Sequence, residues 1–452
     1  MSLKSINPYT GKLIRETEEI PSREAERIIS ESVMAFEKWK KTSFLERSTL
    51  MKNAASVLRK HSSEYAGVIT AEMGKPMKES KAEIEKCAWV CDYYADNAEN
   101  FLKPEVIETD ADKSYAAYEP LGAILGIMPW NFPFWQVFRF AVPAIMAGNS
   151  ALLKHASNVQ ICAEKIIEVF REAGFHPSLF SNLAVGSASM DYIIRHKSIM
   201  AISLTGSEQA GTRVAATAGS VLKKCVLELG GSNAFIVLAD ADLERAATTA
   251  VQARFQNAGQ SCIAAKRFIV EKKISGRFVK LFGDEIGKIR AGDPSDENTM
   301  LGPLCNEKQA DAVADQLKRS TDMGARLVLG GKRDKAFFTP TLVLDVRPGM
   351  PLFEEEVFGP VAPVTIADNA DEAIRLAGET SFGLGVSLFT KDIRKAEELS
   401  EKFHDGSVFI NGLVKSDPRL PFGGTRRSGF GRELSVHGIR EFVNVKTVWI
   451  KR

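Results

Sequence analysis

Ala123-Ile-Leu-Gly-Ile127 is the first of a series of short apolar runs that decides the fold. Ala151-Leu-Leu-Lys154 is the next run, and after it segments with a helical pattern alternate with further apolar runs. The series continues with a helix over 159–172, a strand over 182–185, a helix near 188–196 and a strand over 200–204. Such alternation predicts parallel strands joined by right-handed helical crossovers, which is an α/β fold.

The ends of these expected strands mark a ligand edge. Lys154, Gly186 and Gly206 all follow apolar runs of the first series. Parallel α/β sheets bind ligands beyond the carboxyl ends of their strands. We therefore expect these three residues to lie near a ligand. The glycine pattern of 205–211 departs from G-x-G-x-x-G, so it is weak evidence for a dinucleotide by itself.

A second α/β series begins after Gly230. Its expected elements are strands over 234–238, 267–270, 341–346 and 386–389, with helices over 242–256 and near 276–290. The boundary between the two series falls near residue 229, between Glu228 and Cys262. The sequence thus predicts two α/β domains with an active site between them.

Glu228 and Cys262 are the candidate reactive groups. Cys262 ends the segment Gly259-Gln-Ser-Cys, where backbone N–H groups can stabilise a thiolate, so we interpret it as a nucleophile and not as a structural cysteine. Glu228 lies in an apolar run before a glycine pair, and a dry environment raises a carboxyl pKa toward that of a working base. The six histidines are dispersed and none is near either residue, which disfavours a cysteine peptidase.

Five motifs in order along the chain resemble the aldehyde dehydrogenase superfamily. They are Pro129-Trp-Asn-Phe-Pro133, Glu228-Leu-Gly-Gly231, Gly259-Gln-Ser-Cys262, Glu355-Glu-Val-Phe-Gly-Pro360 and Pro421-Phe-Gly-Gly424. The segments 153–156 and 224–231 look most like bacterial succinate-semialdehyde dehydrogenases that use NAD(P).

The resemblance implies a domain plan. It implies a Rossmann-type cofactor-binding domain over 1–229, an α/β catalytic domain over 230–427, and a return segment with an oligomerisation strand over 428–452. A small β-arm at about 110–120, formed by pairing of 115–119 with 443–450, is expected to build a homodimer or homotetramer.

The same resemblance implies the chemistry. Cys262 attacks an aldehyde, Asn131 and the Cys262 N–H stabilise the oxyanion, and Glu228 activates the water that hydrolyses a thioester. As bare sequence, Glu228 lies 22 residues after Gly206 and could instead hold an adenine ribose, and an asparagine such as Asn131 is more often a turn-former. Acyl transfer to coenzyme A and a catalytically idle binding protein of this fold are the rival functions. The presence of Glu228 disfavours the first, and the complete set of three disfavours the second.

By resemblance, five residues are expected to contact the cofactor. Glu356 holds the nicotinamide ribose, although in an acidic run it would otherwise be a surface charge, and Phe358 packs near the ring. Trp130 precedes Asn131 in the same loop. Gly206 and Ser207 open a helix whose free N–H groups and dipole suit the phosphates.

Lys154 and Ser157 predict which nucleotide is used. NAD-preferring relatives often have a glutamate where Ser157 stands, and a carboxylate there repels the 2′-phosphate of NADP. Ser157 removes that repulsion, while Lys154 supplies a positive charge. We therefore expect NADP to be preferred over NAD.

Arg139 and Ser416 predict the substrate. Arg139 follows Asn131 on an expected helix and is placed to pair with a distal carboxylate, and Ser416 matches a family position that hydrogen-bonds it. Succinic semialdehyde is the first candidate, with another short aldehyde as the alternative. Gln256 stands where another branch has a second arginine, and a solvated surface role is the plain alternative for Arg139.

Composition excludes several other classes. The 59 basic and 57 acidic residues give a net charge of +2, which attracts neither nucleic acid nor an anionic membrane. Apolar stretches fall short of the roughly 20 residues needed to span a bilayer. The six cysteines show no disulfide framework and the start has no apolar leader, so a cytoplasmic location is expected. No metal is expected, because Cys87 and Cys91 lack further ligands.

Overall fold

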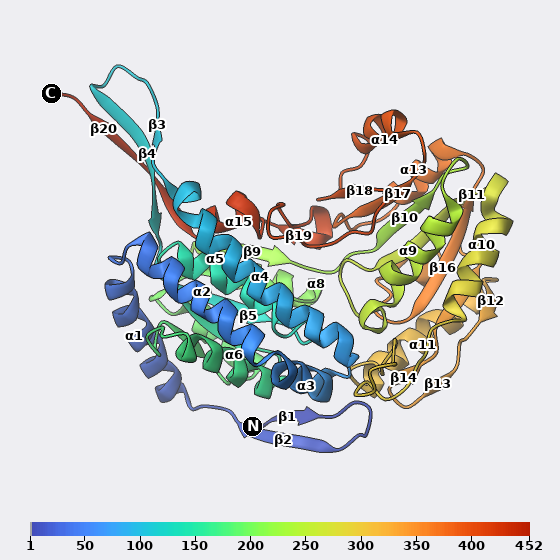
Figure 1. Cartoon of the computed structure of the whole chain (residues 1–452), viewed down its shortest axis with the longest axis horizontal. Coiled ribbons are helices and arrows are strands. Elements are labelled where there is room, and N and C mark those ends of the chain that lie inside the picture. The colour runs from blue at the N-terminus through green and yellow to red at the C-terminus, as the bar shows by residue number, and fades with distance from the viewer. Residues whose placement is uncertain (1) are drawn as a thin grey trace.

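Two α/β lobes, each built on its own sheet, form the body of the molecule, and a narrow arm projects from the first lobe (Figure 1). The computed structural model describes residues 2–452. No helix in this range is long and apolar enough to cross a membrane. The α/β fold predicted from the alternation of apolar runs is confirmed.

The first lobe carries a six-stranded sheet in the order β19-β9-β8-β5-β6-β7. The strands from β9 to β7 in this order are parallel to one another, and β19 pairs antiparallel with β9 at the edge of the sheet. The strands are β5 (Ala123–Met128), β6 (Ser150–His155), β7 (Phe180–Asn182), β8 (Ile199–Thr205), β9 (Lys224–Glu228) and β19 (Gly429–Phe430). The helices are α1 (Ser22–Trp39), α2 (Phe44–Lys60), α3 (Ser62–Met73), α4 (Met77–Leu102), α5 (Trp135–Met146), α6 (Gln160–Glu172), α7 (Met190–Arg195), α8 (Glu208–Ser220) and α15 (Ser435–Arg440).

The second lobe carries a seven-stranded sheet in the order β12-β15-β16-β11-β10-β17-β18, parallel except for β12. Its strands are β10 (Asn233–Val237), β11 (Ala265–Glu271), β12 (Arg326–Leu329), β15 (Thr341–Leu344), β16 (Val361–Ala367), β17 (Val386–Phe389) and β18 (Val408–Ile410). Its helices are α9 (Leu243–Phe255), α10 (Lys272–Ile286), α11 (Glu307–Asp322), α12 (Pro351–Glu354), α13 (Ala370–Gly378) and α14 (Ile393–Ser400). The chain passes from one sheet to the other between Glu228 and Asn233, but the domain boundary at residue 229 stays a prediction.

The arm is a three-stranded sheet of β3 (Glu105–Val106), β4 (Lys113–Pro120) and β20 (Val443–Ile450). β20 pairs antiparallel with β4 over its whole length, as expected, and the chain ends at its tip (Figure 1). Two small hairpins complete the strands: β1 (Ser2–Ile6) with β2 (Leu13–Glu18), and β13 (Arg333–Asp334) with β14 (Phe337–Phe338).

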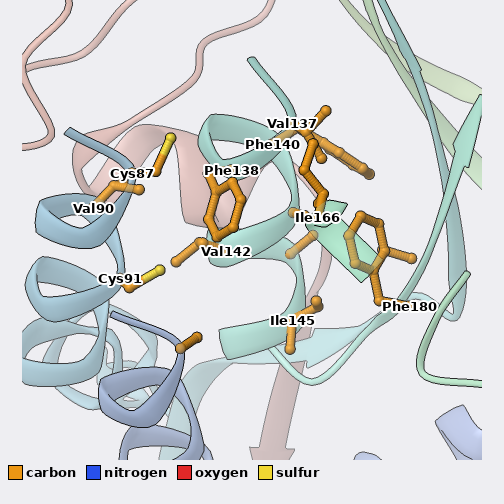
Figure 2. Close-up of a cluster of buried hydrophobic side chains, with 14 of the residues drawn as sticks. Cys87, Val90, Cys91, Val137, Phe138, Phe140, Val142, Ile145, Ile166 and Phe180 are labelled. Carbon is orange, nitrogen blue, oxygen red and sulfur yellow. The ribbon is translucent and has the colours of Figure 1, made fainter. Parts of the chain in front are cut away.

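The core of the first lobe forms where α4 packs on α5. Figure 2 shows Cys87 and Cys91 of α4 facing Phe138 and Val142 of α5. All four side chains are fully buried. The two cysteines lie at positions i and i+4 on the buried face of α4, and they serve as packing residues among apolar neighbours. Within the described chain no cluster of three histidine, cysteine or acidic side chains is arranged to hold a metal ion.

Two predicted elements are displaced. The strand expected over 182–185 is β7 (Phe180–Asn182). The Leu183 N–H still donates to the Leu153 carbonyl of β6 at 2.7 Å, but the chain then leaves the sheet, and Leu183 and Val185 are apolar because they are buried in the core. The helix expected near 276–290 is α10, which begins at Lys272 directly after β11 and ends at Ile286, before Gly287. Neither shift moves a candidate site residue.

Candidate active site

A pocket of about 250 Å³ brings residues of both lobes together. The first lobe contributes the loop after β5 and the ends of β8 and β9. The second lobe contributes the loop before β11 and the segment after α12. The predicted residues that line this pocket are Trp130, Asn131, Gly206, Ser207, Cys262, Glu356 and Phe358. The structure therefore gathers seven of the predicted site residues at one place.

The loop that carries Cys262 has an unusual backbone. Asn257 and Ala258, both with φ 52°, and Gly259, with φ 75°, are three successive residues in the left-handed region. Such a run persists only where surrounding contacts hold it. The buried Glu79 on α4 accepts a hydrogen bond from the Asn257 N–H at 2.8 Å, and burial raises the pKa of this carboxyl to about 7.

Arg254, near the end of α9, holds this loop through hydrogen bonds to backbone carbonyls. Its guanidinium is fully buried and donates to the carbonyl oxygens of Gly259 at 3.0 Å and Ala265 at 2.8 Å, on either side of Cys262. It also donates to Val357 at 3.1 Å and Gly359 at 2.5 Å. One side chain thus ties the cysteine loop to the segment of Phe358.

Three hydrogen bonds hold Asn131 in place. Its Oδ1 accepts from Gln136 Nε2 at 3.1 Å, and its Nδ2 donates to the Gln260 carbonyl at 3.1 Å. The Asn257 amide in turn donates to the Asn131 carbonyl at 2.8 Å. These contacts fix the amide orientation and leave one Nδ2–H for a ligand in the pocket.

The Cys262 thiol lies at the mouth of two cavities, and its side chain is partly exposed. Burial raises its pKa, and the positive charges of Arg139 and Lys266 oppose that shift. The Lys266 ammonium donates to the Cys262 carbonyl at 2.9 Å. Burial therefore favours the protonated thiol, contrary to the thiolate expected from the sequence, while the two cations favour the thiolate.

Glu228 ends β9 and is 2% exposed. Both carboxyl oxygens lack a hydrogen-bond partner. Burial raises its pKa strongly, and the nearby Arg139 counteracts this only in part. The direction of this shift is the one that the sequence predicts, but Glu228 lines neither cavity beside Cys262, and its role as base stays a prediction.

Glu356 and Phe358 form the wall of the pocket opposite Asn131. Glu356 Oε1 accepts from Lys266 at 2.8 Å and from the Gly231 N–H at 3.1 Å. The Phe358 ring meets Trp130 edge to face, with centroids 5.9 Å apart. A Cβ on Gly230 would lie 2.9 Å from the Glu356 carboxyl carbon, so the backbone there has to be bare.

Four adjacent strands, β9, β8, β5 and β6, end at the same edge of the first sheet. Gly206 lines the pocket there, and Ser207 caps α8 by accepting from the Ala210 N–H at 3.3 Å. The 13-residue helix α8 thus points its N-terminus at the pocket. Lys154 is the second-last residue of β6, where burial lowers its pKa, and Ser157 is exposed beyond the end of this strand; neither lines the pocket. The N-terminus of α8 at Ser207, the glycine at 206 and the carboxylate of Glu356 line one pocket and together fit a nicotinamide dinucleotide.

A second cavity, of about 200 Å³, opens on the other side of Cys262. It contains Arg139 and Ser416, as the sequence predicts, together with aromatic walls from Phe132, Trp135 and Phe422. Arg139, however, is not free: its guanidinium forms an ion pair with the buried Glu433 and donates to Thr205 at 3.1 Å. This corrects the expectation of an unpaired arginine waiting for a carboxylate, because the charge is already matched.

Several functional residues were not found from the sequence. Gln136, Gln260, Arg254 and Lys266 all hold the reacting groups in place, and Lys86 lines the second cavity. Only Gln260 lay inside a recognised motif. The others act through backbone carbonyls or across helices, where residue spacing carries no signal.

Comparison with known proteins identifies the family. A family model described as the aldehyde dehydrogenase family matches residues 1–448. A probable succinate-semialdehyde dehydrogenase (NADP+) of Synechocystis sp. is 46% identical over 454 residues, covering 100% of both chains. A succinate semialdehyde dehydrogenase (NAD(P)+) of Escherichia coli K12 is 43% identical, over 99% of this chain and 98% of that one. A succinic semialdehyde dehydrogenase from Streptococcus pyogenes, solved with NADP+, has a TM-score of 0.97 at 35% identity, covering 100% of both chains.

Proposed function

The chain belongs to the aldehyde dehydrogenase family, and on that premise we propose that it oxidises succinic semialdehyde to succinate with NADP or NAD. The observation that carries the proposal is the placing of Cys262 between two cavities. One has the features of a nicotinamide site, and the other is a short aromatic-walled chamber with polar groups. The cysteine stands where cofactor and aldehyde meet.

We assign the first half of the reaction to Cys262 and Asn131. The thiolate attacks the aldehyde carbon, and the free Asn131 Nδ2–H with the Cys262 backbone N–H stabilises the oxyanion of the thiohemiacetal. Each such donor lowers the activation barrier by about 3 to 4 kcal/mol. A nicotinamide cofactor held by residues such as Glu356 and Phe358 would supply the hydride acceptor needed to oxidise the Cys262 thiohemiacetal to a thioester.

The second half belongs to Glu228. Its carboxylate takes a proton from water, and the resulting hydroxide attacks the thioester carbon and releases the acid and the Cys262 thiolate. Glu228 suits this task because nothing hydrogen-bonds its oxygens and burial raises its pKa. Hydrolysis by water is favoured over transfer to coenzyme A for this reason.

NADP is the preferred cofactor in this proposal. Relatives that are 46% identical over their full length are named for NADP, and the E. coli relative for NAD(P). In this chain Lys154 and the exposed Ser157 place one cation and one hydroxyl where the ligand edge continues beyond β6. No carboxylate at position 157 repels a 2′-phosphate.

Two further features extend the proposal. The arm exposes Val445, Trp449 and Ile450, and apolar side chains on a projecting sheet suit a homodimer or homotetramer. All six cysteines are free, which suits a reducing cytoplasm.

A spectrophotometric assay tests the function. The protein with NADP+ and succinic semialdehyde should form NADPH, with NAD+ giving a lower kcat/KM, and Cys262→Ala should form none while still binding NADP+. Oxidation of butanal or propanal at equal or higher kcat/KM would refute the substrate assignment. Absence of reduced cofactor with any aldehyde would refute the activity.

A further inference from the structure

Lys86, on α4, is a cation of the second cavity that no acid neutralises. The cavity that it lines also contains Cys262. No carboxylate of residues 2–452 forms an ion pair with Lys86, and the Lys86 ammonium instead lies 4.3 Å from the centroid of the Trp135 ring and donates to Ser416 Oγ at 2.8 Å. A positive charge in an enclosed cavity, without its counter-ion, is suited to bind an anion.

The acids nearest to Lys86 are already engaged. Glu83 pairs with Lys75 and accepts from the backbone N–H groups of Phe134 and Trp135, at 2.9 Å each. Asp417 is bound through both oxygens by Arg419, at 2.9 and 2.8 Å. Glu79, which also lines the cavity, accepts from the Asn257 N–H at 2.8 Å and forms no ion pair with Lys86. Of the other two cations that line the cavity, Arg139 is paired with Glu433 and Lys415 is exposed to solvent. Lys86 is therefore the cation inside this cavity whose partner has to come from a ligand.

Ser416 completes the arrangement. Its Oγ accepts two hydrogen bonds, from Lys86 Nζ at 2.8 Å and from Trp135 Nε1 at 3.1 Å. With both lone pairs occupied, its own O–H proton is available as a donor. An ammonium and a hydroxyl held side by side match the two oxygens of a carboxylate.

We propose that Lys86, with Ser416, binds the distal carboxylate of a short ω-oxo acid and thereby sets the specificity of the enzyme. This rests on the proposed function, because the aldehyde end of the same molecule must reach Cys262. The cavity, about 200 Å³, lies below the size of pockets for larger ligands, so it selects short substrates. Arg139 acts at a distance in this arrangement, through the fields it exerts on Cys262 and Glu228.

The test compares Lys86→Met with the matched control Lys81→Met, because Lys81 is an exposed lysine of the same helix and lines neither cavity beside Cys262. Succinic semialdehyde and butanal, which have equal carbon numbers, are the substrates. Lys86→Met should lower kcat/KM for succinic semialdehyde about 100-fold, mainly through KM, and leave butanal nearly unchanged. Lys86→Arg should restore much of the loss, and Lys81→Met should change kcat/KM for neither substrate more than about threefold.

The outcomes are separable. A wild-type enzyme with no preference for succinic semialdehyde over butanal overturns both the substrate assignment and the role of Lys86. A wild-type preference that Lys86→Met retains, or equal losses on both substrates, overturns the role of Lys86 alone.

A pH profile of the wild-type enzyme tests the same point without a variant. Burial lowers the pKa of Lys86 to about 8, with Arg139 acting in the same direction and Glu83, Cys87 and Asp417 opposing it. Lys86 thus carries its charge below pH 8 and loses it above. The ratio of kcat/KM for succinic semialdehyde to that for butanal cancels the ionisation of Cys262, and it should fall about tenfold per pH unit above 8. A ratio that stays flat to pH 9.5 overturns the proposal.

Discussion

Gly230→Ala probes the nicotinamide end of the pocket through a single added carbon. The new Cβ would lie 2.9 Å from Cδ of Glu356, too close for a carbon–carbon contact, so the carboxylate must swing away. It then loses the hydrogen bond from the Gly231 N–H at 3.1 Å and the ion pair with Lys266 at 2.8 Å. One charge-assisted hydrogen bond to the cofactor ribose is worth about 2 kcal/mol. We expect the Kd for NADP+ to rise about 30-fold, since about 1.4 kcal/mol corresponds to a factor of ten.

Isothermal titration with NADP+ measures this directly. Gly219→Ala is the matched control, because Gly219 lies inside α8 with no atom near the added carbon, and it should leave binding unchanged while stabilising the fold by about 0.5 to 1 kcal/mol. Glu356→Gln should weaken binding to a similar degree, and combining it with Gly230→Ala should add little. A folded Gly230→Ala protein that binds NADP+ within about threefold of wild type contradicts the role given to Glu356.

Four further experiments test other parts of the site. Ser157→Glu should shift the kcat/KM ratio toward NAD, because a carboxylate repels the 2′-phosphate, and an unchanged ratio removes residue 157 from cofactor choice. Because burial raises the pKa of Cys262, alkylation by iodoacetamide should accelerate from pH 7 to 9 without a plateau, whereas a plateau near pH 7 would show a preformed thiolate. Peroxide should take the same thiol to sulfenic and higher acids or to a mixed disulfide, because Ala264 leaves no neighbouring cysteine, and a Cys262 bridge to another internal cysteine by mass spectrometry argues against this. Arg254→Met should lower both kcat and the melting temperature, since four buried carbonyls lose their donor at about 1 to 3 kcal/mol each, while Arg245→Met on the exposed side of α9 should affect neither.

The fold was predictable because its signals are local. Apolar runs such as 123–127 become buried parallel strands with almost the expected bounds, and 386–389 is predicted to the residue. Errors occurred where buried apolar residues continue past the end of a strand, as at Leu183 and Val185. Periodicity reports burial and not the hydrogen-bonded partner.

Cys262 was predictable from its own sequence setting, whereas Asn131 and Glu356 were predicted only from the family resemblance; all three line one pocket. The charge balance was not predictable. The pairing of Arg139 with Glu433, almost 300 residues away, and the unpaired state of Lys86 depend on which side chains the fold brings within reach. No sequence spacing encodes such a match.

Intact-mass analysis of Glu228→Gln tests the central claim, that a Cys262 thioester is formed and then hydrolysed by water activated at Glu228. After mixing with NADP+ and succinic semialdehyde, this variant should release one equivalent of NADPH per active site and then stop. A succinyl increment should map to the peptide that contains Cys262, whereas the wild-type enzyme should show continuous turnover and no stable adduct. Wild-type steady-state turnover by Glu228→Gln, or a burst without acyl-enzyme on Cys262, would contradict the account.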